Sequence, residues 1–118
     1  GKDLRLTPEE ITVSNFLKDR NIEFDSQGVL ENRFGTIRIV DFIIPSLKYP
    51  KTILEVTKIT TTNPKTLIRT IHRLSDRFKL INDFYLKGVK CIGLVNNARQ
   101  EDLDKYRSKG IFLSINDI

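Results

Sequence analysis

Two short runs of apolar residues, at 36–44 and 52–58, carry the clearest hydrophobic pattern in the chain. Each run has the length of a β-strand, and each is interrupted by one carboxylate, Asp41 in the first and Glu55 in the second. Pro45 stops the first run and the link to the second is short, which predicts two antiparallel neighbouring strands. Because burying an unpaired carboxylate carries a large desolvation penalty, two such acids on consecutive strands favour a shared cation.

A helix is predicted to begin after Thr7. Thr7 can cap it, Pro8 suits the first helical position, and Glu10 completes a capping box. Asn21 is predicted to end the helix in a left-handed conformation. Glu9 and Glu10 suit the positive end of the helix dipole, and the alternative interpretation places one of them near a metal.

The longest periodic stretch runs from residue 64 to about residue 87. Asn63 is a candidate N-cap, Pro64 fits the first helical position, and apolar residues recur at alternating steps of four and three along one face. The nearly unbroken apolar run at 89–95 predicts a buried, parallel strand. The remaining predicted elements are a strand over residues 22–30, a polar helix over 99–108 and a final strand over 111–115.

These elements give the order α-β-β-β-α-β-α-β, which predicts an α/β fold with one mixed sheet flanked by helices. The 118 residues suffice for a single domain, residues 1–118, with one core. The sequence contains no methionine, so we expect a domain excised from a longer protein that carries further domains. The single cysteine excludes an internal disulfide and favours the cytoplasm, and no apolar run approaches the roughly 20 residues of a membrane span.

The net charge of +5 favours a polyanionic partner such as nucleic acid. Lys65, Arg69, Arg73 and Arg77 recur every four residues of the predicted long helix, with His72 beside them, so they follow one face. Such like charges mildly destabilise a helix unless phosphates lie along them. The alternative is a solvated face that two aspartates partly compensate. We favour phosphate contact, because the row begins just after the second acid-bearing strand.

The alternation of strand residues suggests how the two acids could act together. It places Asp41 on one face of its strand with three isoleucines, and Glu55 on one face with Ile53 and Thr57. If both acids point to the same side, they meet at an edge of the sheet. Hard oxygen ligands of this kind select Mg²⁺, which can activate a water and offset charge on a phosphodiester. The alternative is that each acid pairs with an arginine or lysine.

The element order αβββαβ, the strand ending in DFIIP and the next strand carrying ILEVTK resemble the PD-(D/E)XK nuclease superfamily. The resemblance covers residues 7–95. It implies a restriction-endonuclease-like core followed by a C-terminal αβ unit. It further implies a Mg²⁺-dependent endonuclease that acts on DNA or, less often, on RNA, with Mn²⁺ as a substitute. It also implies that the metal is held by Asp41, Glu55, the Val56 carbonyl and, in some members, Glu10. Dimerisation is common among such enzymes.

One position departs from the family pattern. The family lysine is expected two residues after the second acid, where this chain has Thr57. Lys58 follows, but regular alternation sends it to the opposite face. Three alternatives follow. A bulge near Thr57 rotates Lys58 into the site; a lysine or arginine from elsewhere replaces the lysine, with Lys65 or Arg69 at the head of the long helix best placed; or the domain binds without cutting.

We therefore predict a Mg²⁺-dependent DNA endonuclease in which Lys58 or Lys65 supplies positive charge near the attacking water. The nucleic-acid-binding residues are predicted to be Lys65, Arg69, His72, Arg73 and Arg77. The first alternative is a catalytically decayed nucleic-acid-binding or assembly domain with the same fold. The second is a protein-interaction module whose basic helix face meets an acidic partner.

Overall fold

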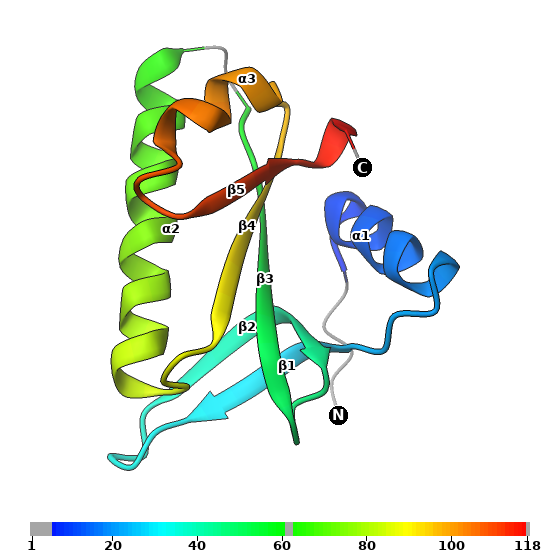
Figure 1. The fold of residues 1–118 in the computed structure, drawn as a ribbon, viewed down its shortest axis with the longest axis vertical. Coiled ribbons are helices and arrows are strands. Elements are labelled where there is room, and N and C mark those ends of the chain that lie inside the picture. Colours follow the sequence, from blue (N-terminus) through cyan, green and yellow to red (C-terminus); the bar gives the residue numbers. More distant parts are fainter. Residues whose placement is uncertain (1–5, 61–62, 118) are drawn as a thin grey trace.

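The structure is a computed structural model that describes residues 6–60 and 63–117. Its order of elements confirms the predicted α/β arrangement (Figure 1). The elements are α1 (Pro8–Asp19), β1 (Asp25–Glu31), β2 (Ile37–Pro45), β3 (Pro50–Lys58), α2 (Pro64–Phe84), β4 (Lys90–Asn96), α3 (Gln100–Leu103), a 3₁₀ turn at Asp104–Tyr106, β5 (Ile111–Ser114) and a second 3₁₀ turn at Ile115–Asp117.

The five strands form one mixed sheet in the order β1-β2-β3-β4-β5. β1, β2 and β3 pair in antiparallel fashion, whereas β3, β4 and β5 pair in parallel fashion, as predicted for the run at 89–95. Figure 1 shows α2 alongside one face of the sheet and α1 on the other side. The β3–β4 pair therefore lies at the centre, and the acid-bearing strands β2 and β3 are direct neighbours.

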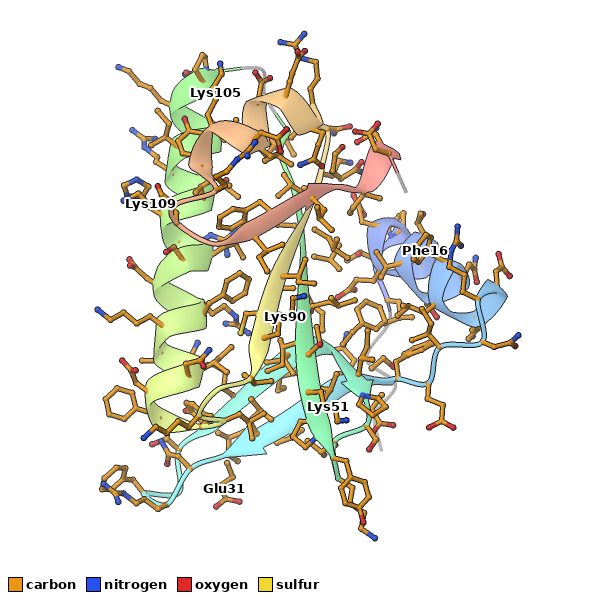
Figure 2. The ribbon with its side chains drawn as sticks, viewed as in Figure 1. Phe16, Glu31, Lys51, Lys90, Lys105 and Lys109 are labelled. Atoms are coloured by element: carbon orange, nitrogen blue, oxygen red, sulfur yellow. The ribbon has the colours of Figure 1, made fainter. Side chains whose placement is uncertain are left out.

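α2 packs the predicted apolar stripe against the sheet. Its buried residues are Ile71, Leu74, Phe78 and Ile81, which follow the steps of three and four. Side chains fill the space between α2 and the strands (Figure 2). Val95 of β4 belongs to one hydrophobic cluster with Ile71, Leu74 and Phe78. None of the helices in the described ranges combines the length and the apolar character that crossing a bilayer requires.

α1 covers the opposite face of the sheet. Val13 and Leu17 of α1 cluster with Phe42 of β2 and Leu54 of β3. Ile53, the neighbour of Leu54, clusters instead with residues of α2, as strand alternation requires. β3 therefore sends odd-numbered residues toward α2 and even-numbered residues toward α1.

Three predicted boundaries are wrong. The long helix ends at Phe84 rather than near residue 87. The first strand begins at Asp25 rather than at residue 22, because Ile22 and Phe24 pack into the cluster around α1 before the chain enters the sheet. The helix predicted over 99–108 contains only α3 and one 3₁₀ turn. The Gln100 side chain bonds to the backbone of β5, at Ser114 and Phe112, and so ties this short helix to the sheet.

The pairing of β2 with β3 stops at the two acids. The ladder is recorded from Phe42 opposite Leu54 down to the proline-bounded link. One step further, Asp41 would face Glu55, but the strands no longer pair there. β3 stays in the sheet through its parallel pairing with β4, which continues without a shift to Lys58. An opening between β2 and β3 therefore begins where the sequence places its two carboxylates.

Candidate active site

The side chains of Asp41 and Glu55 bridge the opening between β2 and β3. The Asp41 amide donates to Glu55 Oε2 at 2.9 Å, and the Val56 amide donates to Asp41 Oδ2 at 2.8 Å. Each acid thus accepts a hydrogen bond from the backbone of the other strand, in place of a bond of the regular ladder. The prediction that the two acids meet is confirmed.

The backbone of Val56 also faces this opening. In an extended strand the amide and carbonyl of one residue point to the same side. Since the Val56 amide points to Asp41, its carbonyl points toward β2 as well. This orientation is compatible with the predicted role of the Val56 carbonyl as a metal ligand, which stays a prediction.

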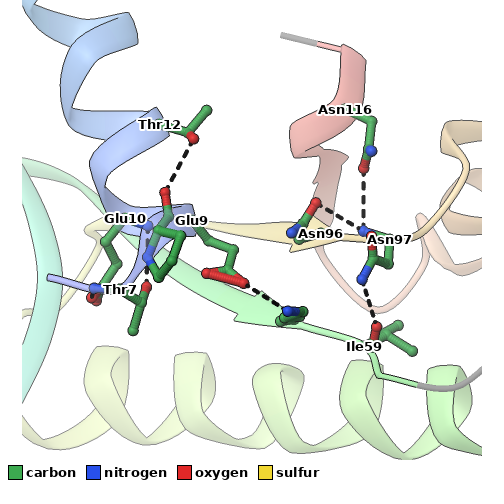
Figure 3. Close-up of polar contacts among 10 residues, drawn as sticks. Thr7, Glu9, Glu10, Thr12, Ile59, Asn96, Asn97 and Asn116 are labelled. Carbon is green, nitrogen blue, oxygen red and sulfur yellow. Dashed lines mark hydrogen bonds and ion pairs between the residues drawn. The ribbon is translucent and has the colours of Figure 1, made fainter.

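α1 brings a third carboxylate to the site. The Thr7 amide donates to Glu10 Oε1 at 2.8 Å and the Glu10 amide donates to Thr7 Oγ1 at 3.2 Å, which confirms the capping box (Figure 3). Glu10 is buried, and its carboxylate is near enough to Asp41 to act on the pKa of that residue. The capping box thus fixes Glu10 beside the two strand acids.

Asp41 is the carboxyl group with the most perturbed environment. Burial raises its pKa most, and the negative charges of Glu55 and Glu10 raise it further, to about 8, against the opposing effect of the Val56 amide. The carboxyl group of Asp41 is therefore harder to ionise than that of an ordinary aspartate. No ion pair within residues 6–60 and 63–117 involves Asp41, so this carboxyl group lies in a cluster with excess negative charge.

Glu55, by contrast, is compensated by Arg77 of α2. Arg77 Nε donates to Glu55 Oε1, and Arg77 Nη2 donates to the Ile39 carbonyl oxygen at 2.6 Å. The guanidinium therefore links α2 to both acid-bearing strands. Of the two alternatives left open by the sequence, pairing with an arginine holds for Glu55 and not for Asp41.

A second arginine of α2 contacts Thr57, the residue at the position expected for the family lysine. Arg73 Nη2 donates to Thr57 Oγ1 at 3.2 Å. Lys58 lies on the other face of β3, with its Nζ 3.7 Å from Glu9 Oε1. The register between β3 and β4 continues through Thr57 and Lys58 without a shift. The prediction that a bulge brings Lys58 into the site is therefore wrong.

Lys65 and Arg69 are exposed near the beginning of α2. Lys65 precedes Arg73 by eight residues, which is about 12 Å along the helix axis. Lys65 and Arg69 do not line the pocket beside Glu55, whereas Arg73 and Arg77 of the same helix do. A catalytic role for Lys65 stays a prediction. A helix rises about 1.5 Å per residue and a strand about 3.3 Å, so a helix that runs back along β3 brings its middle rather than its start toward Glu55. This difference does not tell which arginine reaches the site.

The two strand acids and the two arginines of α2 line a small pocket of about 150 Å³ between β3 and α2. Hydroxyl, carboxylate and guanidinium groups line it, with one leucine. Among the described residues, no three His, Cys, Asp or Glu side chains already stand in an arrangement that holds a metal ion. The pocket is lined by Asp41, Glu55, Val56, Thr57, Arg73, Leu74 and Arg77.

The comparisons with known proteins bear on the fold. The sequence matches no protein-family model and no curated protein. Among solved structures, the chain is similar to the restriction endonuclease PspGI in complex with its substrate DNA, with a TM-score of 0.63 and 13% identity. The match covers 89% of this chain and 43% of PspGI, so the chain spans less than half the length of that enzyme. The likeness confirms the predicted restriction-endonuclease-like fold.

Proposed function

We propose that this domain is a metal-dependent DNA endonuclease, which hydrolyses phosphodiester bonds at the opening between β2 and β3. The observation that carries the proposal is the reciprocal bonding of Asp41 and Glu55, which brings two carboxylates to one gap in the sheet. Glu10 adds a third carboxyl group. Acids gathered in this way repel one another, and a cation relieves the repulsion.

The donor set fits Mg²⁺, with Mn²⁺ as a substitute, because carboxylate and carbonyl oxygens are the ligands that these ions take. Asp41 and Glu55 would hold the ion, with the Val56 carbonyl and Glu10 as further oxygen donors. When bound, the ion supplies a more acidic water and compensates charge on the phosphate. The raised pKa of Asp41, caused first by burial and then by the charges of Glu55 and Glu10, supports this fit, because a bound cation would offset both effects.

We propose that Arg73 supplies the positive charge that the lysine supplies in the family pattern. Thr57 accepts a hydrogen bond from its guanidinium and thereby orients it toward the pocket. A guanidinium keeps its proton under all ordinary conditions, so Arg73 cannot act as a general base. It can stabilise negative charge that develops on the phosphate oxygens during hydrolysis.

The exposed basic residues of α2 are proposed to contact the DNA backbone. Lys65, Arg69 and His72 lie at the surface of the helix that also carries Arg73. A row of cations binds phosphates through release of counterions, whatever the base sequence. The solved neighbour PspGI was determined with its substrate DNA, which supports DNA as the partner here.

The test is cleavage of plasmid DNA with Mg²⁺ by the wild type, Asp41→Asn and Glu55→Gln. Each substitution removes one carboxylate charge and preserves size, so we expect cleavage to fall roughly a hundredfold or more. The matched control is Asp83→Asn, an exposed aspartate of α2, which should cleave at the wild-type rate. Cleavage that survives in Asp41→Asn would remove the carboxylate pair from the mechanism.

A second candidate function is DNA binding without cleavage. Two observations favour it: Thr57 stands where the family has lysine, and Arg77 already compensates Glu55. This function predicts salt-sensitive retention of duplex DNA, with intact plasmid after incubation with Mg²⁺ or Mn²⁺. The same plasmid assay therefore separates the two functions.

A further inference from the structure

We propose that Arg77 is an internal counter-cation, which occupies the place of a divalent metal on Glu55 and leaves it when a DNA phosphate engages its guanidinium. This inference rests on the proposed function. It adds that the substrate itself opens the metal site, so that metal and DNA bind cooperatively.

The first argument is that both carboxylate oxygens of Glu55 already have a hydrogen-bond partner while Arg77 stays in place, and that Arg77 compensates the charge that would attract a metal. Its Oε2 accepts from the Asp41 amide and its Oε1 accepts from Arg77 Nε. The first bond belongs to the backbone of β2 and holds the opening in shape. The second involves a side chain on a separate element, so it is the one that can be exchanged for a metal.

The second argument is the difference in exposure between the two partners. The Glu55 side chain is 5% exposed, whereas the Arg77 side chain is 26% exposed. The carboxylate is therefore fixed in the interior, while the guanidinium lies at the boundary with solvent. Movement of Arg77 toward a ligand at the surface leaves Glu55 in position with an uncompensated charge, which attracts a cation strongly at a buried site.

The third argument identifies the ligand that would move Arg77. A guanidinium binds phosphate oxygens through two parallel hydrogen bonds, at least as well as it binds a carboxylate. Arg73, one helical turn before Arg77, lines the same pocket and presents a second guanidinium. Two arginines on one edge of a pocket match the oxygens of one phosphodiester group.

The proposal makes a thermodynamic statement that can be measured without any cleavage. If DNA removes Arg77 from Glu55, DNA must raise the affinity for the metal, and the metal must raise the affinity for DNA by the same factor. Removal of the guanidinium by mutation should have the same effect on metal affinity in the absence of DNA.

The experiment is a titration of the protein with Mn²⁺, in which the electron paramagnetic resonance signal of the unbound ion reports binding. Arg77→Met keeps the length of the side chain and removes its charge. We expect Arg77→Met to bind Mn²⁺ roughly tenfold more tightly than the wild type or better, because one neighbouring positive charge is lost. Lys79→Met, which removes an exposed cation of the same helix, is the control and should bind like the wild type.

A second measurement uses the wild type alone, in case Arg77→Met does not fold. Mn²⁺ is titrated with and without a short duplex whose phosphorothioate linkages resist cleavage, and Glu55→Gln with the same duplex corrects for ions bound to DNA. We expect the duplex to tighten Mn²⁺ binding to the wild type. Equal Mn²⁺ affinity with and without the duplex, or between folded Arg77→Met and the wild type, would overturn the proposal.

The outcomes keep the two proposals apart. Cleavage of plasmid by a wild type whose Mn²⁺ affinity responds neither to DNA nor to Arg77→Met would leave the endonuclease standing and remove the role of Arg77. Tighter Mn²⁺ binding by Arg77→Met without cleavage by any variant would support the counter-cation and contradict the endonuclease.

Discussion

Arg73 donates a hydrogen bond from its guanidinium to Thr57 Oγ1 at 3.2 Å. Thr57 lies two residues after Glu55 on β3, where the PD-(D/E)XK pattern has its lysine. A threonine supplies a hydroxyl and no charge, so the positive charge near this position is that of the Arg73 guanidinium on α2. In the proposed mechanism, Arg73 and Thr57 together would take the part of that lysine.

Substitution of Arg73 tests this replacement. Arg73→Met should lower the rate of Mg²⁺-dependent cleavage by roughly a hundredfold, which is typical for the loss of one donor that stabilises developing negative charge. The double variant Thr57→Lys with Arg73→Met should recover part of the rate, because a lysine on β3 restores the charge. Lys79→Met serves as the control, and wild-type cleavage by Arg73→Met would contradict the role of Arg73.

The raised pKa of Asp41 predicts how stability depends on pH. Between about pH 4 and pH 8 the native protein holds a proton on Asp41 that the unfolded chain releases. Because the native state binds more protons, the contribution of Asp41 to the free energy of unfolding falls as the pH rises through this window. Asp41→Asn removes this contribution while its side-chain oxygen can still accept from the Val56 amide.

Urea denaturation of the wild type and Asp41→Asn across this pH range provides the measurement. The stability of Asp41→Asn relative to the wild type should increase with pH from about 4 to about 8. Asp83→Asn should follow the wild type in parallel. Parallel curves for Asp41→Asn as well would show that the carboxyl group of Asp41 is not perturbed.

Lys58 is expected to matter for stability and not for cleavage. Its Nζ lies 3.7 Å from Glu9, whose side chain is 9% exposed, while the lysine side chain itself is 52% exposed. Lys58→Ala should lower the free energy of unfolding by about 1 kcal/mol or less, since pairs that reach solvent contribute little. Plasmid cleavage should stay at the wild-type rate. A tenfold or larger loss of cleavage would place Lys58 back in the site.

The buried residues of α2 hold the helix on the sheet and thereby position both arginines. We expect them to contribute more to stability than exposed apolar residues of the same helix. Ile71 is fully buried and Ile68 of the same helix is 40% exposed, which makes the two a matched pair. Ile71→Ala should lower the free energy of unfolding by about 2–5 kcal/mol, and Ile68→Ala by clearly less. Chemical denaturation measures both, and equal losses would contradict the orientation of α2.

Local chemistry explains what the sequence could predict. The capping box of Thr7 and Glu10 depends on residues three positions apart, so its geometry follows directly from the sequence. The meeting of Asp41 and Glu55 follows from a short link between two strands, which fixes their register. Asn21, with a φ of 56°, likewise adopts the left-handed conformation predicted for it.

Tertiary placement explains what the sequence could not predict. Which arginine of α2 reaches Thr57 depends on the axial offset between helix and strand, which follows from the packing of the buried residues of α2 against the sheet. Arg73 and Lys65 have the same position in a four-residue repeat, so the repeat cannot distinguish them. The pairing of Arg77 with Glu55 depends on the same offset.

Anomalous diffraction from crystals of the domain grown with Mn²⁺ and an uncleavable DNA duplex tests the central claim most directly. The account predicts one Mn²⁺ peak in the opening between β2 and β3, bound by carboxylate oxygens of Asp41 and Glu55, with Arg77 turned from Glu55 to a phosphate. An Arg77 guanidinium still on Glu55, with no Mn²⁺ peak beside Asp41, would contradict it.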